Sequence, residues 1–264
     1  MYKYVTLTIA VLMACAPAFA ELKVVATLST FADLVETIGG DHVTVDFIAP
    51  PQFNPHFIEP RPSDVLKTRK ADVFVHSGLD LESWRDPLLN AAGNARIKPG
   101  AHGEISLADG VTLLNVPDAG VTRAAGDIHL YGNPHYWLGP ENGLIMARNI
   151  ATRLSEIDPE NAQDYESNFY DIQARLTEEI GEWRSAVDPF AGDRLVAYHD
   201  QWPYFAEFAG IRIEEFIEPK PGIPPGPKHL VYLESYIESN GVRGIVHATV
   251  FPSKPAQALS KKTG

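Results

Sequence analysis

The sequence predicts an α/β protein with two βα lobes, each carrying a parallel sheet, joined by one long rigid helix. From Glu21 onward, short β-branched runs alternate with helical stretches, which is typical of a parallel sheet covered by helices. Residues 159–187 then carry one apolar stripe at helical spacing, and further strand and helix patterns follow over 188–264. This order of patterns predicts two lobes with a single helical connection.

In the first predicted lobe, residues 21–158, each strand pattern is followed by a helix pattern. The expected strands are LKVVATL, HVTVDFIAP and ADVFVHSG, and the expected helices are FADLVETIGG and SDVLKTRK. Pro140, after Gly139, opens a further helix. Ligands of open parallel sheets bind in the loops beyond the carboxyl ends of the strands. We therefore expect the functional side chains in these loops.

The connecting helix has a start signal, an apolar face and a stop signal. Asp158 is expected to cap its first turn and Pro159 to occupy its first helical position, while Pro189 ends it. Its apolar residues recur at steps of three and four: Tyr165, Phe169, Ile172, Leu176, Ile180, Trp183 and Val187. At 1.5 Å per residue, a helix over 159–187 is about 43 Å long.

The second predicted lobe, residues 188–264, is shorter than the first. Its expected strands are LVAYH, IRIEEFIEP and GIVHATV, and its expected helices are WPYFAEFAG and LVYLESYIESNG. The sequence reaches Gly264 within the next expected helix, with fewer strands than the first lobe. We therefore expect a small or truncated second lobe.

Residues 1–20 have the pattern of an export signal. Lys3 supplies the positive start, residues 5–14 the apolar stretch, and residues 18–20, Ala-Phe-Ala, a small-x-small cleavage site. The apolar stretch is too short to span a bilayer, which needs about 20 residues. We expect a soluble protein that is exported to the periplasm.

The single cysteine, Cys15, lies inside this signal, in a sequence that also resembles the lipid-attachment box of bacterial lipoproteins. A membrane-anchored lipoprotein is therefore the alternative to simple cleavage after Ala20. No cysteine follows Ala20, so disulfides, zinc–thiolate sites and cysteine nucleophiles are excluded from the folded part. Any transition metal there has to be held by nitrogen and oxygen donors.

The chain is acidic, with 22 Lys and Arg against 34 Asp and Glu and a formal net charge of −12. Nucleic-acid binding depends on cationic contacts to phosphates, so this balance argues against a nucleic-acid partner. A negative surface also attracts cations, but acidity of this size is equally typical of a soluble exported protein. The charge alone therefore does not identify the ligand.

Three histidines, His56, His135 and His199, lie in separate loop-like settings between rigid or aromatic residues. The first two follow Asn-Pro, whose fixed backbone angle presents each imidazole from a stiff turn. All three are expected after strands, where the loops of a parallel sheet converge. This placement predicts one metal site built from the three imidazoles.

The remaining histidines receive less weight. His129, six residues before His135, and His247, at the end of an expected strand, are secondary candidates for ligands. The others are expected to be surface or structural residues: His42, His76, His102 and His229.

Three imidazoles leave one coordination position open for water, as in zinc hydrolases, with Glu59 or Asp200 as the base. The sequence, however, has no H-E-x-x-H helix, no G-x-S-x-G turn and no Gly-rich phosphate loop. The usual local signatures of hydrolysis are therefore missing, and the fourth ligand decides between a closed binding site and a zinc-dependent hydrolase, the less favoured alternative.

Four segments resemble motifs of the cluster A-I, or cluster 9, solute-binding proteins of bacterial ABC transporters for zinc and manganese. NPHFIEPRPSD resembles the family's D-P-H-x-Y-E-P-T-P-S-D loop, and GNPHYWLGP resembles D-P-H-x-W-L-D-P. VAYHDQWPYFAEFAGI resembles H-D-x-F-x-Y-F-A-x-x-Y-G-L, and GLDLESW resembles G-x-x-L-E-x-W. The four motifs stand in the family's order, and the resemblance covers nearly all of the chain after Ala20.

The resemblance implies that His56 and His135 are ligands from the first lobe and that His199 is a ligand from the second. It implies no enzymatic activity, because the zinc ion is a transported ligand delivered to a cognate permease and ATPase at the inner membrane. Manganese carriers of the family tend to have a carboxylate where His199 stands, so zinc is expected and manganese is the alternative. We expect a monomer.

The chain departs from the family pattern in three places. The family's usual fourth ligand, an aspartate near the C-terminus, has its matching position beyond Gly264. The aspartate of W-L-D-P is Gly139 here, and the family's E-P is replaced at 248–249 by Ala-Thr, directly after His247. Water, His129 or His247 is then expected to complete the ligand set.

Overall fold

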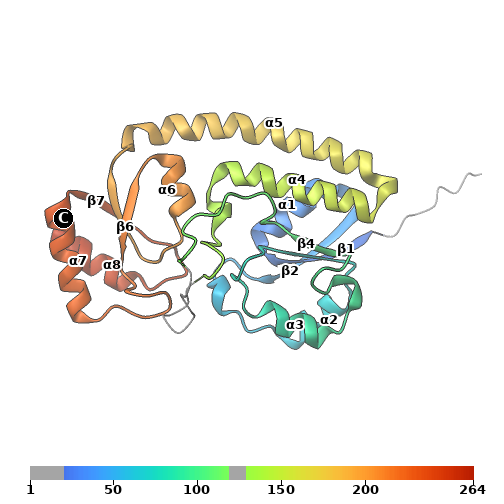
Figure 1. Ribbon diagram of the computed structural model, residues 1–264, viewed down its shortest axis with the longest axis horizontal. Coiled ribbons are helices and arrows are strands. Elements are labelled where there is room, and N and C mark those ends of the chain that lie inside the picture. The colour runs from blue at the N-terminus through green and yellow to red at the C-terminus, as the bar shows by residue number, and fades with distance from the viewer. Residues whose placement is uncertain (1–20, 119–128) are drawn as a thin grey trace, which may run out of the picture.

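Two α/β lobes connected by a long helix make up the structure, a computed structural model that describes residues 21–118 and 129–264 (Figure 1). The expected export signal, residues 1–20, lies outside the described residues. Within the described part, no helix combines the length and the apolar character needed to cross a bilayer. The predicted fold class, with two parallel sheets and a helical connection, is confirmed.

The described part of the first lobe contains a four-stranded parallel sheet in the order β2-β1-β3-β4. Its strands are β1 Leu22–Leu28, β2 Val43–Ala49, β3 Val73–His76 and β4 Glu104–Ser106. Its helices are α1 Ser29–Gly39, α2 Pro62–Lys70, α3 Arg85–Ala92 and α4 Pro140–Ile157. Short 3-10 helices are η1 Gly40–His42, η2 Pro55–Phe57, η3 Ala95–Ile97 and η5 Tyr136–Leu138.

The core of the first lobe lies between this sheet and the helices that cover it. Five consecutive residues of β1, from Val24 to Leu28, are buried, because the strand is central and helices cover both faces of the sheet. Phe31 from α1, Phe74 from β3 and Ile150 from α4 are all inaccessible to solvent in the same cluster. Each such side chain stabilises the fold by about 1.5–3 kcal/mol through burial.

The second lobe has a three-stranded parallel sheet within the described residues, in the order β6-β5-β7. Its strands are β5 Arg194–Ala197, β6 Arg212–Phe216 and β7 Val242–Val246. Its helices are α6 Pro203–Ala209, α7 Pro227–Asn240 and α8 Ser253–Thr263. A separate, smaller cluster of buried side chains forms its core: Val196, Tyr198, Ile217, Leu233, Ile237, Phe251 and Leu259.

Helix α5, Ala162–Val187, connects the lobes and runs along one side of both (Figure 1). The short helix η6, Pro159–Asn161, precedes it, and η7, Asp188–Phe190, follows it. With 26 residues, α5 is about 39 Å long. Only Tyr165 and Phe169 of its predicted apolar stripe are buried, and Trp183 is 42% exposed, because the C-terminal half of the helix extends beyond the core of the first lobe.

The predicted capping role of Asp158 is wrong. Its side chain makes no hydrogen bond to a backbone N–H at the start of the helical segment. Its carboxylate instead accepts hydrogen bonds of 2.7 Å from the side chains of Asn161 and Tyr165. Asp158 is also the C-cap residue of α4. Its backbone therefore ends that helix, while its side chain bonds to residues of the next helical segment.

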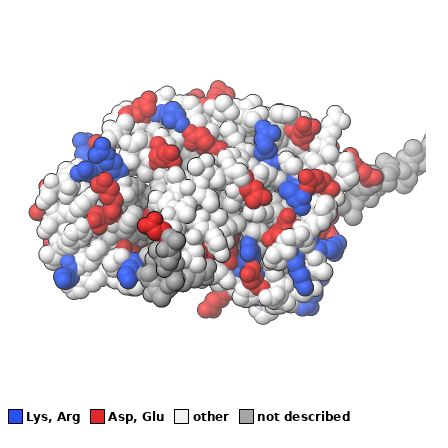
Figure 2. Space-filling view, in the orientation of Figure 1, with Lys and Arg blue, Asp and Glu red and all other residues white. Residues whose placement is uncertain are grey.

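Acidic and basic side chains are interspersed over both lobes on the face shown in Figure 2. Neither sign forms a continuous area that spans this face. The net negative charge of −12 therefore does not by itself locate a cation site there, and the site has to be found from the histidines.

Candidate metal centre

His56 and His135 are presented by the same local structure. The side-chain oxygen of Asn54 accepts a hydrogen bond from the backbone N–H of His56 at 3.0 Å, and that of Asn133 accepts one from His135 at 3.1 Å. The proline between each pair fixes the backbone angle in the middle of the turn. Each Asn-Pro-His triplet is thus a stiff turn closed by its own asparagine, as its sequence predicts.

The His135 turn is tied to both lobes. The hydroxyl of Tyr136 donates to the carbonyl of Ser77, directly after β3, at 2.5 Å. From the second lobe, the hydroxyl of Tyr204 donates to the carbonyl of Asn133 at 2.7 Å. The amide of Asn133 in turn donates to the carbonyl of Asp200 at 2.8 Å. These bonds hold His135 at the boundary between the lobes.

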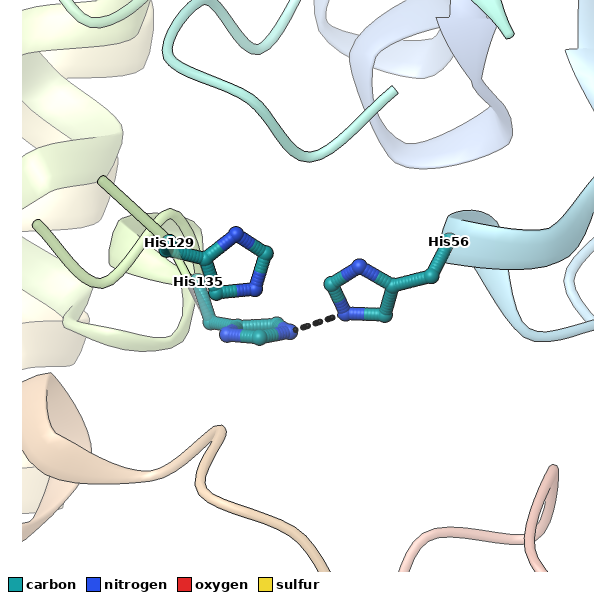
Figure 3. A group of neighbouring side chains, drawn as sticks. All are labelled: His56, His129 and His135. Atoms are coloured by element: carbon teal, nitrogen blue, oxygen red, sulfur yellow. Dashed lines mark hydrogen bonds between the residues drawn. The ribbon is translucent and has the colours of Figure 1, made fainter. Parts of the chain in front are cut away.

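Three histidines of the first lobe form a compact group, His56, His129 and His135 (Figure 3). The Nε2 atoms of His56 and His135 are 3.0 Å apart. The ring of His129 stacks on that of His56 with a centroid separation of 5.0 Å. One ring nitrogen from each residue lies within 4.8 Å of the other two, a spacing at which the three could hold one metal ion.

His199 reaches the same group from the second lobe. It follows β5, and its ring centroid lies 5.4 Å from that of His56 and 5.4 Å from that of His135. All three predicted ligands are buried, with 3–5% of their surface exposed. The structure therefore brings His56, His135 and His199 together and adds His129 to them.

The hydrogen bonds of the cluster determine which ring nitrogens carry protons. Asn133 Oδ1 accepts from the backbone of His135, so it also accepts from His135 Nδ1, at 2.9 Å. A neutral His135 then has its lone pair on Nε2. The proton between the two Nε2 atoms therefore belongs to His56, which donates to His135.

Two carboxylates orient the other two rings. Glu218 lies 2.9 Å from Nδ1 of His199, and Asp80 lies 2.9 Å from Nδ1 of His129. Each carboxylate accepts the Nδ1 proton, which leaves the lone pair of a neutral ring on Nε2. The sequence prediction did not identify either carboxylate as part of the site, although Asp80 belongs to the GLDLESW segment.

The environment favours neutral imidazoles, the form that binds metals. Burial lowers the pKa of His56 well below its usual value, and the neighbouring His199 and His129 lower it further. Burial likewise lowers the pKa of His135, with further lowering by His56. Burial raises the pKa of the Asp200 carboxyl, which stands next to the cluster. The rings of His56 and His135 are therefore neutral at neutral pH, so neither has to lose a net proton before it coordinates.

Two cavities flank the cluster. One of about 210 Å³ is lined by His129 and His199 together with Asp200, Glu218 and Lys220. The other, of about 200 Å³, is lined by His56 and His135 together with Trp137, Gln201 and Phe251. Each cavity has walls from both lobes. The histidines therefore occupy the boundary at which the lobes meet.

The structure places His247 differently from the other candidates. Its ring packs edge-on against Tyr198 at 5.4 Å, and its Nε2 lies 3.1 Å from the carbonyl oxygen of Pro252. That bond engages one of its two ring nitrogens, and its ring contact is with Tyr198 and not with the other histidines. His247 is therefore a poor candidate for the fourth ligand, and His129 is the histidine that sequence reasoning underweighted.

Comparisons with known proteins identify the family of the chain. The family model described as "ZnuA: Zinc-uptake complex component A periplasmic" matches residues 24–264. The chain is 30% identical over 253 residues to the iron ABC transporter substrate-binding lipoprotein MtsA of Streptococcus pyogenes serotype M1, covering 92% of this chain and 77% of that protein. It is 28% identical to the manganese ABC transporter substrate-binding lipoprotein PsaA of Streptococcus pneumoniae, covering 91% and 76%.

Solved structures show the same fold. A crystal structure of ZnuA superimposes with a TM-score of 0.78 at 26% identity, covering 92% of this chain and 88% of that chain. The names of these proteins refer to zinc, iron and manganese, so the family alone does not select one metal.

Proteins of this kind are extracytoplasmic binding components of ABC importers and not enzymes, which removes the hydrolase alternative. Their partners are a metal ion and the other components of the transporter. The match over residues 24–264, the fold and the ordered motifs lead to one conclusion: the chain belongs to the ZnuA, or cluster 9, family of metal-binding substrate-binding proteins of ABC importers.

Proposed function

We propose that this protein is the periplasmic zinc-binding component of an ABC importer, with His56, His135 and His199 as ligands of the transported ion. The observation that carries the proposal is the convergence of these buried imidazoles from both lobes. Their ring centroids lie 5.0–5.4 Å from one another. Such a site closes around an ion when the lobes meet. It hands the ion to the permease and ATPase at the inner membrane without any chemical step.

The donor chemistry supports zinc over manganese. Imidazole nitrogen suits zinc, whereas manganese prefers carboxylate, carbonyl and water oxygen. The nearby carboxylates of Glu218 and Asp80 are each engaged by an imidazole Nδ1, at 2.9 Å. They therefore balance the charge of the ion from behind the rings rather than facing it directly.

A competition experiment tests this proposal. The purified protein is incubated with zinc and manganese in equimolar excess, passed through a desalting column, and its metal content is measured by mass spectrometry. We expect one zinc and no manganese per chain. Manganese retained at the expense of zinc would favour the manganese alternative, and loss of both metals would contradict a metal-carrier role.

A matched pair of variants connects binding to the site. His199→Ala removes a proposed ligand from the second lobe, whereas His247→Ala removes a more exposed histidine of the same lobe that bonds to Pro252. Only the first variant is expected to lose zinc on the desalting column.

A further inference from the structure

His129 lies close enough to the proposed ligands to share an ion with them. Its ring centroid is 5.0 Å from that of His56 and 5.7 Å from that of His135. Figure 3 shows His129 and His135 on one side of the group, facing His56 from the other. With His129 included, the site contains three histidines of the first lobe and one of the second.

The backbone around Asp80 directs a carboxylate at His129. Gly78 and Leu79 both have positive φ, 77° and 53°, and Leu79 is unusual there because its side chain disfavours this region. Asp80, directly after them, accepts a hydrogen bond from Nδ1 of His129 at 2.9 Å and one from the backbone of Leu130 at 3.0 Å. Asp80 thereby holds both the ring of His129 and the chain that carries it.

The inward-facing nitrogen of His129 has no hydrogen-bond partner. Among the described residues, the buried side-chain nitrogen and oxygen atoms without a partner are His129 Nε2 and His199 Nε2. Buried polar groups are nearly always hydrogen-bonded, so two exceptions require an explanation. Both belong to the same cluster, and both line the same cavity of about 210 Å³. The side chain of His129 is only 10% exposed.

We infer that His129 is the fourth protein ligand of the ion, which closes an all-imidazole site, and that Asp80 is the positioning residue that holds it. This inference rests on the proposed zinc-binding function. Zinc sites without catalytic activity are usually closed by four ligands, whereas an open fourth position is typical of catalysis. Coordination by His129 accounts for its unpartnered Nε2. The four-ligand set is then complete with the histidines of this cluster.

The two lobes supply unequal numbers of ligands in this set. His56, His129 and His135 belong to the first lobe, and only His199 comes from the second. Separation of the lobes therefore breaks one metal–ligand bond and leaves three. The first lobe is then the one that retains the ion during capture and release.

The coordination number can be measured directly by X-ray absorption at the zinc edge. We expect four nitrogen neighbours at about 2.0–2.1 Å in the zinc-loaded protein. In His129→Ala, we expect three nitrogens and one oxygen from water, and a zinc Kd raised at least tenfold. His102→Ala, which removes an exposed histidine of the same lobe, should change neither the spectrum nor the Kd.

Variants of Asp80 separate positioning from coordination. Asp80→Ala should raise the zinc Kd about 10–100-fold, the range typical of residues that orient metal ligands, while the coordination number stays at four. Asp80→Asn keeps an oxygen that accepts from Nδ1, so it should recover most of the affinity. Circular dichroism and thermal unfolding of the metal-free variants check that each one folds.

The outcomes distinguish this inference from the proposed function. Failure of the unaltered protein to bind zinc would refute the proposed function itself. Tight zinc binding with three nitrogens and one oxygen in the unaltered protein would refute the role of His129 and indicate water or Asp200 instead. Unchanged affinity in a folded His129→Ala protein would refute it equally, with the zinc function intact.

Discussion

The Nε2 atoms of His56 and His135 lie 3.0 Å apart, in a direct imidazole–imidazole hydrogen bond between turns 79 residues apart in the chain. Because Asn133 accepts the Nδ1 proton of His135, the shared proton comes from His56. An ion that coordinates both Nε2 atoms takes the place of this proton, which then has to move to Nδ1 of His56. Coordination through both Nε2 atoms is thus coupled to a change of tautomer at His56.

The stability of the metal-free protein is expected to depend on pH in the acidic range. Burial lowers the pKa of His56 and His135 in the folded state, while the unfolded value is about 6.5. Above this pH both states are neutral. Below it, the unfolded chain binds protons first, so the free energy of unfolding falls as the pH decreases.

Each histidine contributes a slope of up to about 1.4 kcal/mol per pH unit between its folded and unfolded pKa. Urea unfolding of metal-free protein at pH 7.5 and 5.5 measures the effect, and His135→Gln should reduce it. An unfolding free energy that does not change between the two pH values would show that these imidazoles are not kept neutral by the fold.

Replacing His199 with alanine should weaken zinc binding at least tenfold and leave the far-UV circular dichroism nearly unchanged. The residue lies in the boundary between the lobes, so its loss removes a proposed ligand without emptying the core of either lobe. A chelator-competition titration gives the Kd. If the Kd stays within twofold of the original value, His199 is not a ligand.

Glu218 is expected to affect affinity through His199. Its carboxylate accepts the Nδ1 proton at 2.9 Å, and both side chains are nearly buried. Glu218→Ala should therefore raise the zinc Kd about 10–100-fold. Glu218→Gln retains an accepting oxygen and should show a smaller effect. Equal losses in the two variants would point to the negative charge, and not the hydrogen bond, as the main contribution.

Tyr136 is expected to contribute to stability more than to metal binding. It is fully buried, and its hydroxyl donates to the carbonyl of Ser77. Tyr136→Phe leaves that carbonyl without its partner and should lower the free energy of unfolding by about 1–3 kcal/mol. Tyr170→Phe serves as the control, since Tyr170 is 53% exposed and its hydrogen bond is 3.4 Å long. Equal effects in the two variants would contradict this role.

Much of the fold could be predicted from local patterns. The alternation of strand and helix residues predicted β1, α1, β2, α2 and β3 and the order of elements in the second lobe. The pattern failed for β4, which has three residues with polar side chains on both sides of Ile105, too short to show alternation. It also failed for Asp158, because side-chain partners compete with the helix backbone for its carboxylate.

The candidate site could be predicted in part. The Asn-Pro-His turns identified His56 and His135 because their geometry is local and each asparagine acts on its own turn. The position of His129 beside them could not be predicted in the same way. It depends on Asp80, 49 residues earlier in the chain, and on packing that only the folded lobe creates.

The most direct test is a crystal structure of the zinc-loaded protein with anomalous data on both sides of the zinc absorption edge. We expect one strong anomalous peak per chain, about 2.0–2.1 Å from the Nε2 atoms of His56, His135 and His199. A peak at another position, or zinc bound in solution with no peak among these histidines, would contradict the proposed site.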